Sequence, residues 1–452
     1  MPDRFAMWLL LGICLVNHAL PVADGAEWKA AAAKAKITPT ESMWMAGYAS
    51  RNKPSEGVAQ DLFAKALVIE DSAGKRLAIV TLDLIGVPRA LREAVEQQAR
   101  QQFGLPPEAL LMNASHTHCG PELRVPRAET DAGTDSARAA QALAYSSMLQ
   151  TTILKLIGDA IAKLEPVNLS YSHARCGFAM NRRLPTDNGY QNSPYPDGPV
   201  DHDVPVLRIE AEGKLRAILF GYACHNTTLS FYQFCGDYAG YAQEYLEAAH
   251  PEAIALFVTG CGADQNPYPR GQLEQCQQHG RALANAVEAA LLPKPKPVSG
   301  PLKMALDTAA LQFAPPPDRA GLEERTKSKN AYESRHAKRL LDQLDKDGKI
   351  PLEYPYLAQV IRFGNDLTLI ALSGEVVVDY SVRLKRELAG ETVWMAGYSN
   401  DVFGYVPSQR VLKEGGYEAG GAMLFTSLPG PFADDVEERI HVKVRELLKR
   451  TK

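Results

Sequence analysis

Residues 66–83, ALVIEDSAGKRLAIVTLD, decide the class of fold. Two apolar runs flank a short polar segment that contains a glycine, which predicts a β-hairpin with a glycine turn. The second run, residues 76–83, is almost continuously apolar, whereas a strand with one face in water would alternate polar and apolar residues. We therefore expect this strand to lie inside a layered sheet, covered on both faces.

The same plan occurs twice more, in residues 206–225 and 360–375. In all three hairpins the apolar second strand ends on a polar residue: Asp83, His225 or Glu375. The ends of buried strands are where α/β scaffolds commonly place their chemistry. These side chains are therefore candidates for a functional site.

Amphipathic helical patterns lie between the strands. The expected fold is α/β, with layered mixed β-sheets and packed helices in a single large domain. The charged segment 316–350 favours a solvated surface helix, and the proline-rich segment 184–203 favours a long loop of the kind that lines substrate sites. Helices are expected over residues 88–103, 136–164, 238–250, 271–292 and 434–449.

The overall composition is that of a globular protein. The 452 residues are 46% hydrophobic and 23% charged, with a net charge of −4. Acidic and basic residues are interspersed and no basic block occurs, which argues against nucleic-acid binding. No phosphate-binding glycine loop of the P-loop type is present, and nothing in the sequence indicates a protein partner.

The N-terminal segment has the features of a secretory signal. Arg4 precedes an apolar core, residues 7–16, and small residues follow it at 23–26. This pattern predicts a signal peptide over residues 1–26, a mature domain over 27–452, and export to the periplasm or the medium. The apolar core is short for a transmembrane span, although an uncleaved membrane anchor is the alternative.

Six cysteines follow the predicted signal segment. An even number of cysteines in an exported protein is compatible with disulfides, and six cysteines allow 15 pairings. The expected bridges are Cys224 with Cys235 and Cys261 with Cys276, since each pair brackets a predicted loop.

The segment His116-Thr117-His118-Cys119-Gly120-Pro121 is the strongest indication of a metal site. It follows residues 109–115, an apolar run typical of a buried strand. In an extended segment His116 and His118 would point to the same side, because strand side chains alternate with a period of two. The alternative is a pair of hydrogen-bonded loop histidines.

Three further residues could complete such a site, although each has a structural alternative. His225 follows an apolar strand, but a lone histidine there is often a core residue whose hydrogen bonds are made within the protein. Glu375 follows Ser373-Gly374, where a glutamate often caps a helix. Tyr405 lies in a glycine-containing turn, where a tyrosine usually serves packing.

Taken in order, these motifs resemble those of the neutral, non-lysosomal ceramidase family, which are zinc amidohydrolases that cleave the N-acyl bond of ceramide. The resemblance extends from about Lys36-Ile37-Thr38-Pro39 to Tyr417-Glu418. It implies Zn²⁺ as the cofactor, a lipid amide as the substrate, and peripheral contact with a membrane. The zinc ligands implied are His116, His225, Glu375 and Tyr405.

The resemblance also implies roles for residues around the metal. His118 matches a histidine near the scissile carbonyl, and Tyr417 a tyrosine that contacts the reacting group. Both could donate to a developing oxyanion, while Glu375 or His118 could carry a proton to the leaving amine. Arg182 matches a substrate-binding arginine, although Arg183 is the other candidate.

This sequence departs from the family pattern in three places. Asn266 or Gln265 stands where the family carries a serine, the segment after Tyr417 is too short for the family's immunoglobulin-like C-terminal domain, and residues 57–59 lack an expected histidine. The first two departures keep two other functions open. These are a metal hydrolase that acts on another N-acyl compound or an ester, and a non-catalytic exported binding protein that keeps the fold.

The pentapeptide Trp-Met-Ala-Gly-Tyr occurs twice, at residues 44–48 and 394–398. It could mark an internal repeat or a chance likeness between two glycine-bounded strands, and the sequence alone supports neither.

Overall fold

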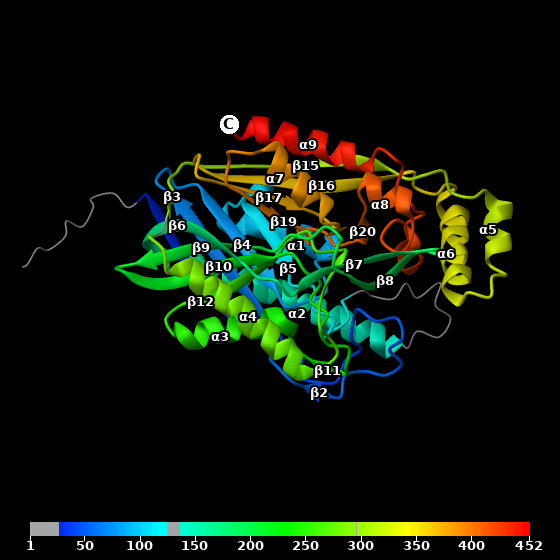
Figure 1. Ribbon diagram of the computed structural model, residues 1–452, viewed down its shortest axis with the longest axis horizontal. Helices are drawn as coiled ribbons and strands as arrows, with labels where there is room; N and C mark the ends of the chain where they lie inside the picture. Colours follow the sequence, from blue (N-terminus) through cyan, green and yellow to red (C-terminus); the bar gives the residue numbers. More distant parts are fainter. Residues whose placement is uncertain (1–26, 124–135, 295) are drawn as a thin grey trace, which may run out of the picture.

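Two β-sheets packed face to face form the centre of the protein, and helices cover their outer faces (Figure 1). The computed structural model describes residues 27–123, 136–294 and 296–452. The predicted signal peptide, residues 1–26, lies outside the described residues.

The first sheet has nine strands in the order β12-β10-β9-β6-β1-β3-β4-β5, with β14 paired to β6. Its strands are β1 (Trp28–Lys36), β3 (Phe63–Asp71), β4 (Arg76–Leu82), β5 (Leu110–Ala114), β6 (Glu165–Arg175), β9 (Asp203–Ala211), β10 (Lys214–Tyr222), β12 (Ile254–Thr259) and β14 (Lys296–Pro297). The second sheet has the order β15-β16-β17-β19, formed by β15 (Leu302–Gln312), β16 (Glu353–Phe363), β17 (Leu367–Leu372) and β19 (Val393–Ala396).

The three predicted hairpins are confirmed. Strands β3 and β4, β9 and β10, and β16 and β17 each pair antiparallel. Along β3 the side chains alternate between two cores: Leu67 and Ile69 face the core between the sheets, whereas Ala66 and Val68 face the core under the helices. These strands are almost continuously apolar because both of their faces are buried.

Helices lie on both outer faces of the paired sheets (Figure 1). The predicted helices are confirmed within a few residues, and α1 ends at Gly104, whose φ of 69° places it in the left-handed region that glycine adopts readily. The helices are α1 (Arg89–Phe103), α2 (Ser136–Ile161), α3 (Asp237–Ala249), α4 (Leu273–Leu291), α5 (Arg319–Arg325), α6 (Ala331–Asp347), α7 (Asp379–Glu387), α8 (Gln409–Glu414) and α9 (Val436–Arg450), with 3₁₀ turns η1 (Pro107–Ala109) and η2 (Gly421–Phe425). Among the helices of the described ranges, none is both long and apolar enough to cross a bilayer.

The prediction of a long loop over residues 184–203 is wrong for its first half. Strands β7 (Ala179–Thr186) and β8 (Gly189–Tyr195) form a hairpin there, joined to the short β13 (Gln265–Pro267). Strand β8 is an edge strand, where proline is tolerated because one side makes no ladder hydrogen bonds. The prolines therefore did not exclude a hairpin.

The charged segment forms two helices, α5 and α6, at one end of the molecule (Figure 1). Their outer faces are solvated, as expected, but Leu322, Leu340 and Ile350 form a small core between them. Side chains of α6 also bind the turn η2, since Arg339 Nη2 donates to the backbone oxygen of Leu424 at 2.7 Å. This pair of helices is therefore attached beside η2.

The two expected disulfides are not formed, because all six cysteines of the described chain are free and buried. Cys261 and Cys276 belong to different cores, under the second sheet and under the first. Instead, Cys276 lies beside Asp237, with Sγ 3.5 Å from Oδ1, and Cys235 Sγ accepts the Asp237 amide at 3.3 Å. Loop spacing alone did not reveal which thiols come together.

Candidate metal centre

A single buried asparagine joins three strand ends. Asn113, in β5, accepts a hydrogen bond from the amide of Thr259 in β12 at 2.9 Å and donates to the carbonyl of Gly397, directly after β19, at 2.8 Å. Strands β5 and β12 are the opposite edges of the first sheet, so this residue brings those edges together and ties them to the second sheet. Because β10 pairs with β12 and β17 pairs with β19, the segments that follow β5, β10 and β17 converge.

The four predicted ligands meet where these segments converge. Glu375 begins the short strand β18 (Glu375–Val376) and is the register partner of Tyr405, which begins β20 (Tyr405–Val406). Glu375 Oε2 lies 3.2 Å from Nε2 of His116 and 3.3 Å from Nε2 of His225. The Tyr405 hydroxyl lies 3.1 Å from the same nitrogen of His225.

The two histidines of the HxH motif do converge, but not through strand alternation. Strand β5 ends at Ala114, and His116 has a φ of 61°, in the left-handed region that is uncommon for residues other than glycine. His118 then begins a turn, and its Nε2 lies 3.1 Å from Nε2 of His116. Such backbone conformations cluster at functional sites.

The hydrogen bonds of the two imidazoles show which ring nitrogen of each faces the centre. His116 Nδ1 donates to the carbonyl of Ile85 at 2.6 Å, and His225 Nδ1 donates to the carbonyl of Gly262 at 2.8 Å. In a neutral imidazole the other nitrogen then carries a lone pair. Both Nε2 atoms therefore present lone pairs to the Glu375 carboxylate, which is also an acceptor.

Three acceptor atoms this close are unfavourable unless a cation lies between them. Tetrahedral nitrogen and oxygen ligands of zinc, about 2.0–2.1 Å from the ion, lie about 3.3 Å from one another. The spacings of 3.2 and 3.3 Å around Glu375 match that value. Glu375 Oε2 has no conventional hydrogen-bond partner among the described residues. The residues present therefore fit a zinc ion.

The protonation states of these groups suit a divalent cation. Burial, with the nearby Arg182 guanidinium, lowers the pKa of His225 to about 3. Burial also lowers the pKa of His118 well below its usual value. Although burial opposes it, the interaction with His116 and His225 holds the pKa of Glu375 well below its usual value. At neutral pH His118 and His225 are therefore neutral imidazoles and Glu375 is a carboxylate.

His118 and Tyr417 occupy the more open side of the centre. The nitrogens of His116, His118 and His225 lie within 4.8 Å of one another, and His118 Nδ1 has no hydrogen-bond partner among the described residues. The Tyr417 ring packs against the Tyr405 ring with centroids 5.2 Å apart and is 42% exposed. Tyr417 thus lies one ring outward from Tyr405, toward solvent.

Arg182 is buried and makes hydrogen bonds to groups of the protein. Its Nη2 donates to the Tyr405 hydroxyl at 2.9 Å, and its Nε donates to Glu418 at 2.8 Å. Arg183 is similarly paired with Glu418 and Glu414. The geometry makes Arg182 a support for Tyr405, and a direct contact between either arginine and a substrate stays a prediction.

Asn266, at the position where the resemblance leads one to expect serine, belongs to the same buried network. Its Oδ1 accepts a hydrogen bond from Arg182 Nη1 at 3.2 Å, and its Nδ2 donates to Asn192 at 3.3 Å. Gln265 is also buried and donates to the carbonyl of Ala223 at 2.7 Å. The side-chain amides of Asn266 and Gln265 thus make hydrogen bonds that support residues next to the centre.

Three residues near the centre, Asn113, Tyr48 and Tyr398, were not predicted from the sequence. The ring of Tyr398 lies 4.4 Å from that of His116, and the ring of Tyr48 lies 4.8 Å from that of His118. The signal for the tyrosines was the repeated pentapeptide, which ends in Tyr48 in one copy and Tyr398 in the other. Asn113 had no signal beyond a polar residue in an apolar strand.

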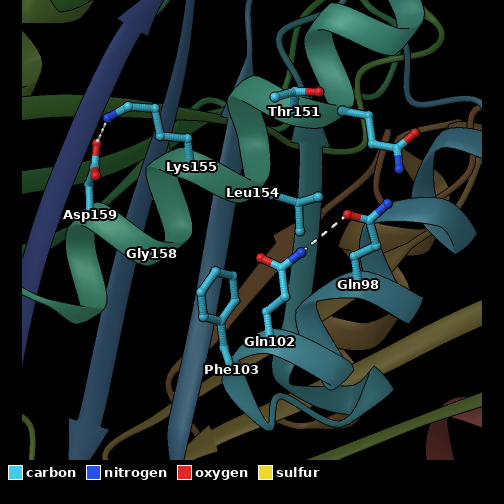
Figure 2. Close-up of a pocket in the computed structure, with 9 residues that line it drawn as sticks. Gln98, Gln102, Phe103, Thr151, Leu154, Lys155, Gly158 and Asp159 are labelled. Carbon is cyan, nitrogen blue, oxygen red and sulfur yellow. Dashed lines mark hydrogen bonds and ion pairs between the residues drawn. The ribbon is translucent and has the colours of Figure 1, made fainter.

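A separate depression of about 390 Å³ lies between α1 and α2 (Figure 2). It is lined by Gln98 and Gln102 of α1 and by Lys155 and Asp159 of α2, and the last two form an ion pair. None of the centre's residues lines it, and it offers no histidine or cysteine.

Residues 29–296 match the family described as "Neutral/alkaline non-lysosomal ceramidase, N-terminal". The chain belongs to this family. It is 28% identical over 257 residues to the "Neutral ceramidase" of Pseudomonas aeruginosa, a match that covers 53% of this chain and 36% of that relative. The chain thus matches about a third of this ceramidase's length.

Two solved ceramidase structures share the fold. The crystal structure of the neutral ceramidase from Pseudomonas aeruginosa superposes with a TM-score of 0.70 at 20% identity, covering 93% of this chain and 74% of that one. A structure titled "Ceramidase complexed with C2" gives a TM-score of 0.68 at 19% identity, covering 93% and 76%. At these identities the likeness shows the fold alone.

Proposed function

We propose that this ceramidase-family protein is a zinc-dependent hydrolase that cleaves the N-acyl amide bond of a ceramide-like lipid with a metal-activated water. The observation that carries the proposal is the convergence of His116, His225 and Glu375, in which one carboxylate oxygen lies 3.2 and 3.3 Å from the two Nε2 atoms. Family membership supports the reaction class.

His116, His225, Glu375 and Tyr405 would hold the ion. Zinc bound there would bring the pKa of its water toward ~7 and polarise the carbonyl of the amide. The carbonyls of Ile85 and Gly262 fix the tautomers of the two histidines, so their Nε2 lone pairs need no rearrangement to bind. Arg182 holds the Tyr405 hydroxyl beside His225.

Tyr417 could stabilise the negative charge that develops on the carbonyl oxygen, and His118 could transfer a proton. Burial raises the pKa of Tyr417 to about 12, so its phenol stays protonated and can donate to the developing oxyanion. His118 is neutral and keeps an unpaired Nδ1, so it can exchange a proton with the substrate. The ionised Glu375 carboxylate is the second group able to carry a proton to the leaving amine.

A run of aromatic rings favours a substrate with an apolar chain. It leads outward from Tyr405 through Tyr417 to Phe425, whose ring lies 6.3 Å from that of Tyr417, and on to Tyr332 of α6 at 4.9 Å. Tyr417 and Phe425 are 42% and 39% exposed. Exposed aromatic rings beside a polar centre suit a lipid amide, and they would also support peripheral contact with a membrane.

Export is part of this proposal. Its support is the signal-like pattern of residues 1–26, with residues 27–452 as the mature catalytic domain. Expression in a bacterial host, followed by fractionation and N-terminal sequencing, tests it. A periplasmic protein that begins near residue 27 supports export, and an uncleaved cytoplasmic protein contradicts it.

The deciding experiment compares zinc content and amide hydrolysis in the wild type and in His116→Ala and His225→Ala. We expect about one zinc per wild-type chain, with release of fatty acid from N-acylsphingosines, and loss of both in the two variants. His279→Ala is the matched control, since His279 is buried and bonds the carbonyl of Pro269 outside the centre. Full zinc content in both site variants would refute the centre.

Asn266 favours a second candidate, a metal hydrolase with another N-acyl or ester substrate. The test is a panel of ceramides of several chain lengths beside simple N-acyl amines and esters. Efficient turnover of ceramide excludes this candidate. A non-catalytic binding protein is excluded by zinc-dependent turnover of any amide.

A further inference from the structure

The two copies of the pentapeptide Trp-Met-Ala-Gly-Tyr end beside the histidines of the centre. Residues 44–48 and 394–398 are far apart in sequence and lie in different surroundings, the second copy running out of β19. Yet Tyr48 packs edge-on against His118, and Tyr398 packs against His116. Neither tyrosine is needed by the reaction proposed above.

The backbone of Tyr398 links two of the segments that carry metal ligands. Its amide donates to the carbonyl of Gly374 at 3.0 Å, directly before Glu375, and its carbonyl accepts the amide of Ala114 at 3.3 Å, two residues before His116. Tyr398 has a φ of 48°, a left-handed conformation that is costly for a residue with a large side chain. The surrounding structure therefore fixes this residue.

The side chain of Tyr398 contacts both metal-site imidazoles. The side chain is fully buried, its ring lies 4.4 Å from the His116 ring and 6.1 Å from the His225 ring, and its hydroxyl lies 3.4 Å from His225 Nδ1. That nitrogen already donates to Gly262 at 2.8 Å, so the hydroxyl contact is the weaker one. The ring, more than the hydroxyl, restricts the two imidazoles.

We propose that Tyr398 is a positioning residue for the metal centre, whose ring holds His116 and His225 in the orientation that binds the ion. The inference rests on the proposed zinc site but not on its substrate. Losing a side chain that orients metal ligands typically lowers metal affinity 10–100-fold.

The test measures zinc affinity by competition with a chelator, together with the melting temperature of the metal-free protein. Tyr398→Leu removes the ring's shape and Tyr398→Phe keeps it. Tyr145→Leu is the matched control, because Tyr145 on α2 is also buried and donates its hydroxyl to the carbonyl of Ile37 at 2.7 Å, outside the centre.

We expect Tyr398→Leu to weaken zinc binding by about tenfold to a hundredfold, and Tyr398→Phe to stay close to the wild type. Tyr145→Leu should lower the melting temperature without changing zinc affinity. Wild-type affinity in Tyr398→Leu overturns the inference, and so does an equal loss in Tyr145→Leu. If zinc binding falls in Tyr398→Leu but no amide is cleaved by the wild type, the proposed function fails and the positioning role stands. A wild type that binds no zinc overturns both.

Discussion

Oε2 of Glu375 lies 3.2 Å from Nε2 of His116, whose Nδ1 faces the carbonyl of Ile85 at 2.6 Å. With Nδ1 donating to that carbonyl, a favourable contact at Nε2 requires either a proton or a metal cation between the two atoms. Replacing the carboxylate should therefore affect the empty and the metal-loaded protein differently.

Glu375→Gln tests the carboxylate in both states. The new amide can donate to Nε2 of His116 or His225, so we expect the metal-free variant to stay within about 1 kcal/mol of the metal-free wild type. The same variant should lose most of its stabilisation by zinc, because an amide is a weaker ligand than a carboxylate. Thermal unfolding in chelator and in zinc measures both effects. A Glu375→Gln variant that zinc stabilises as much as the wild type contradicts the role of Glu375 as a ligand.

A buried histidine far from the centre gives a prediction for acid stability. His441 on α9 is fully buried and stacks on Tyr380. Burial, with the Arg383 charge, lowers its pKa to about 4, although Glu387 and Glu437 at 3.8 Å oppose that shift. The folded state thus keeps His441 neutral where the unfolded chain protonates it.

Between pH 6.5 and about 4 the unfolded state therefore binds more protons at this position, and stability falls as the pH falls. His441 alone should contribute a loss of up to about 3 kcal/mol across that window. In His441→Gln this loss is absent, so the stability difference between wild type and variant should narrow as the pH drops. Urea unfolding at four pH values in chelator measures it, and a constant difference would contradict the prediction.

The strands and most of the centre could be predicted from the sequence because burial leaves a strong pattern. Strands covered on both faces must be apolar, so His225 and Glu375 stand out at their ends, and the resemblance added Tyr405. The convergence of these residues could not be predicted, since it depends on Asn113 joining strand ends that are 146 and 284 residues away along the chain.

Other structural details could not be predicted because their signals are not local. The direction of the Arg182 side chain is set by Glu418, 236 residues later, and its contact with a substrate stays a prediction. The disulfides were predicted from loop length, whereas Cys276 lies in the core under the first sheet and Cys261 in the core under the second. Prolines suggested a loop where an edge strand, β8, tolerates them.

The buried pair of Arg182 and Glu418 should behave as one unit. Removing Glu418 leaves the buried Arg182 without a carboxylate partner, which typically costs 3–5 kcal/mol, whereas removing Arg182 leaves Glu418 paired with Arg183. We expect Glu418→Gln to destabilise by that order and Arg182→Gln by less, and the double variant to cost less than their sum. Chemical denaturation measures the cycle, and simple additivity would contradict the coupling.

The same variants distinguish a role of Arg182 in supporting Tyr405 from a role in binding substrate. If Arg182 acts through Tyr405, both single variants should lower turnover to a similar extent. If Arg182 contacts substrate directly, its loss should raise KM while Glu418→Gln does not. Steady-state kinetics on an N-acylsphingosine decides between the two.

The buried thiols should be unreactive in the folded protein. Burial raises the pKa of Cys176 to about 11 and that of Cys224 well above its usual value, so little thiolate forms at neutral pH. We expect the six cysteines from Cys119 to Cys276 to resist alkylation when folded and all to react in denaturant without a reductant. Peptide mass spectrometry reads each site, and a pair that reacts only after reduction would reveal a disulfide.

Gly47 gives a prediction about how closely the backbone approaches His118. Its φ is 101°, and a Cβ at this position would lie 2.5 Å from Cγ of His118. Gly74, in the turn between β3 and β4, has a φ of 80° but nothing within 4 Å of the corresponding point. Gly74→Ala is therefore a matched control, which shares the backbone strain of Gly47→Ala without the collision.

Both variants should lose stability, on the order of 1–2 kcal/mol from the left-handed backbone alone. Only Gly47→Ala should move the His118 ring, and a displacement of about 1 Å in a reacting group can lower turnover about a hundredfold. Because His118 is not among the predicted ligands, zinc content should stay near that of the wild type in both variants. Equal turnover in Gly47→Ala and Gly74→Ala would show that the position of His118 does not limit the reaction, whereas lost zinc in Gly47→Ala alone would place His118 among the ligands.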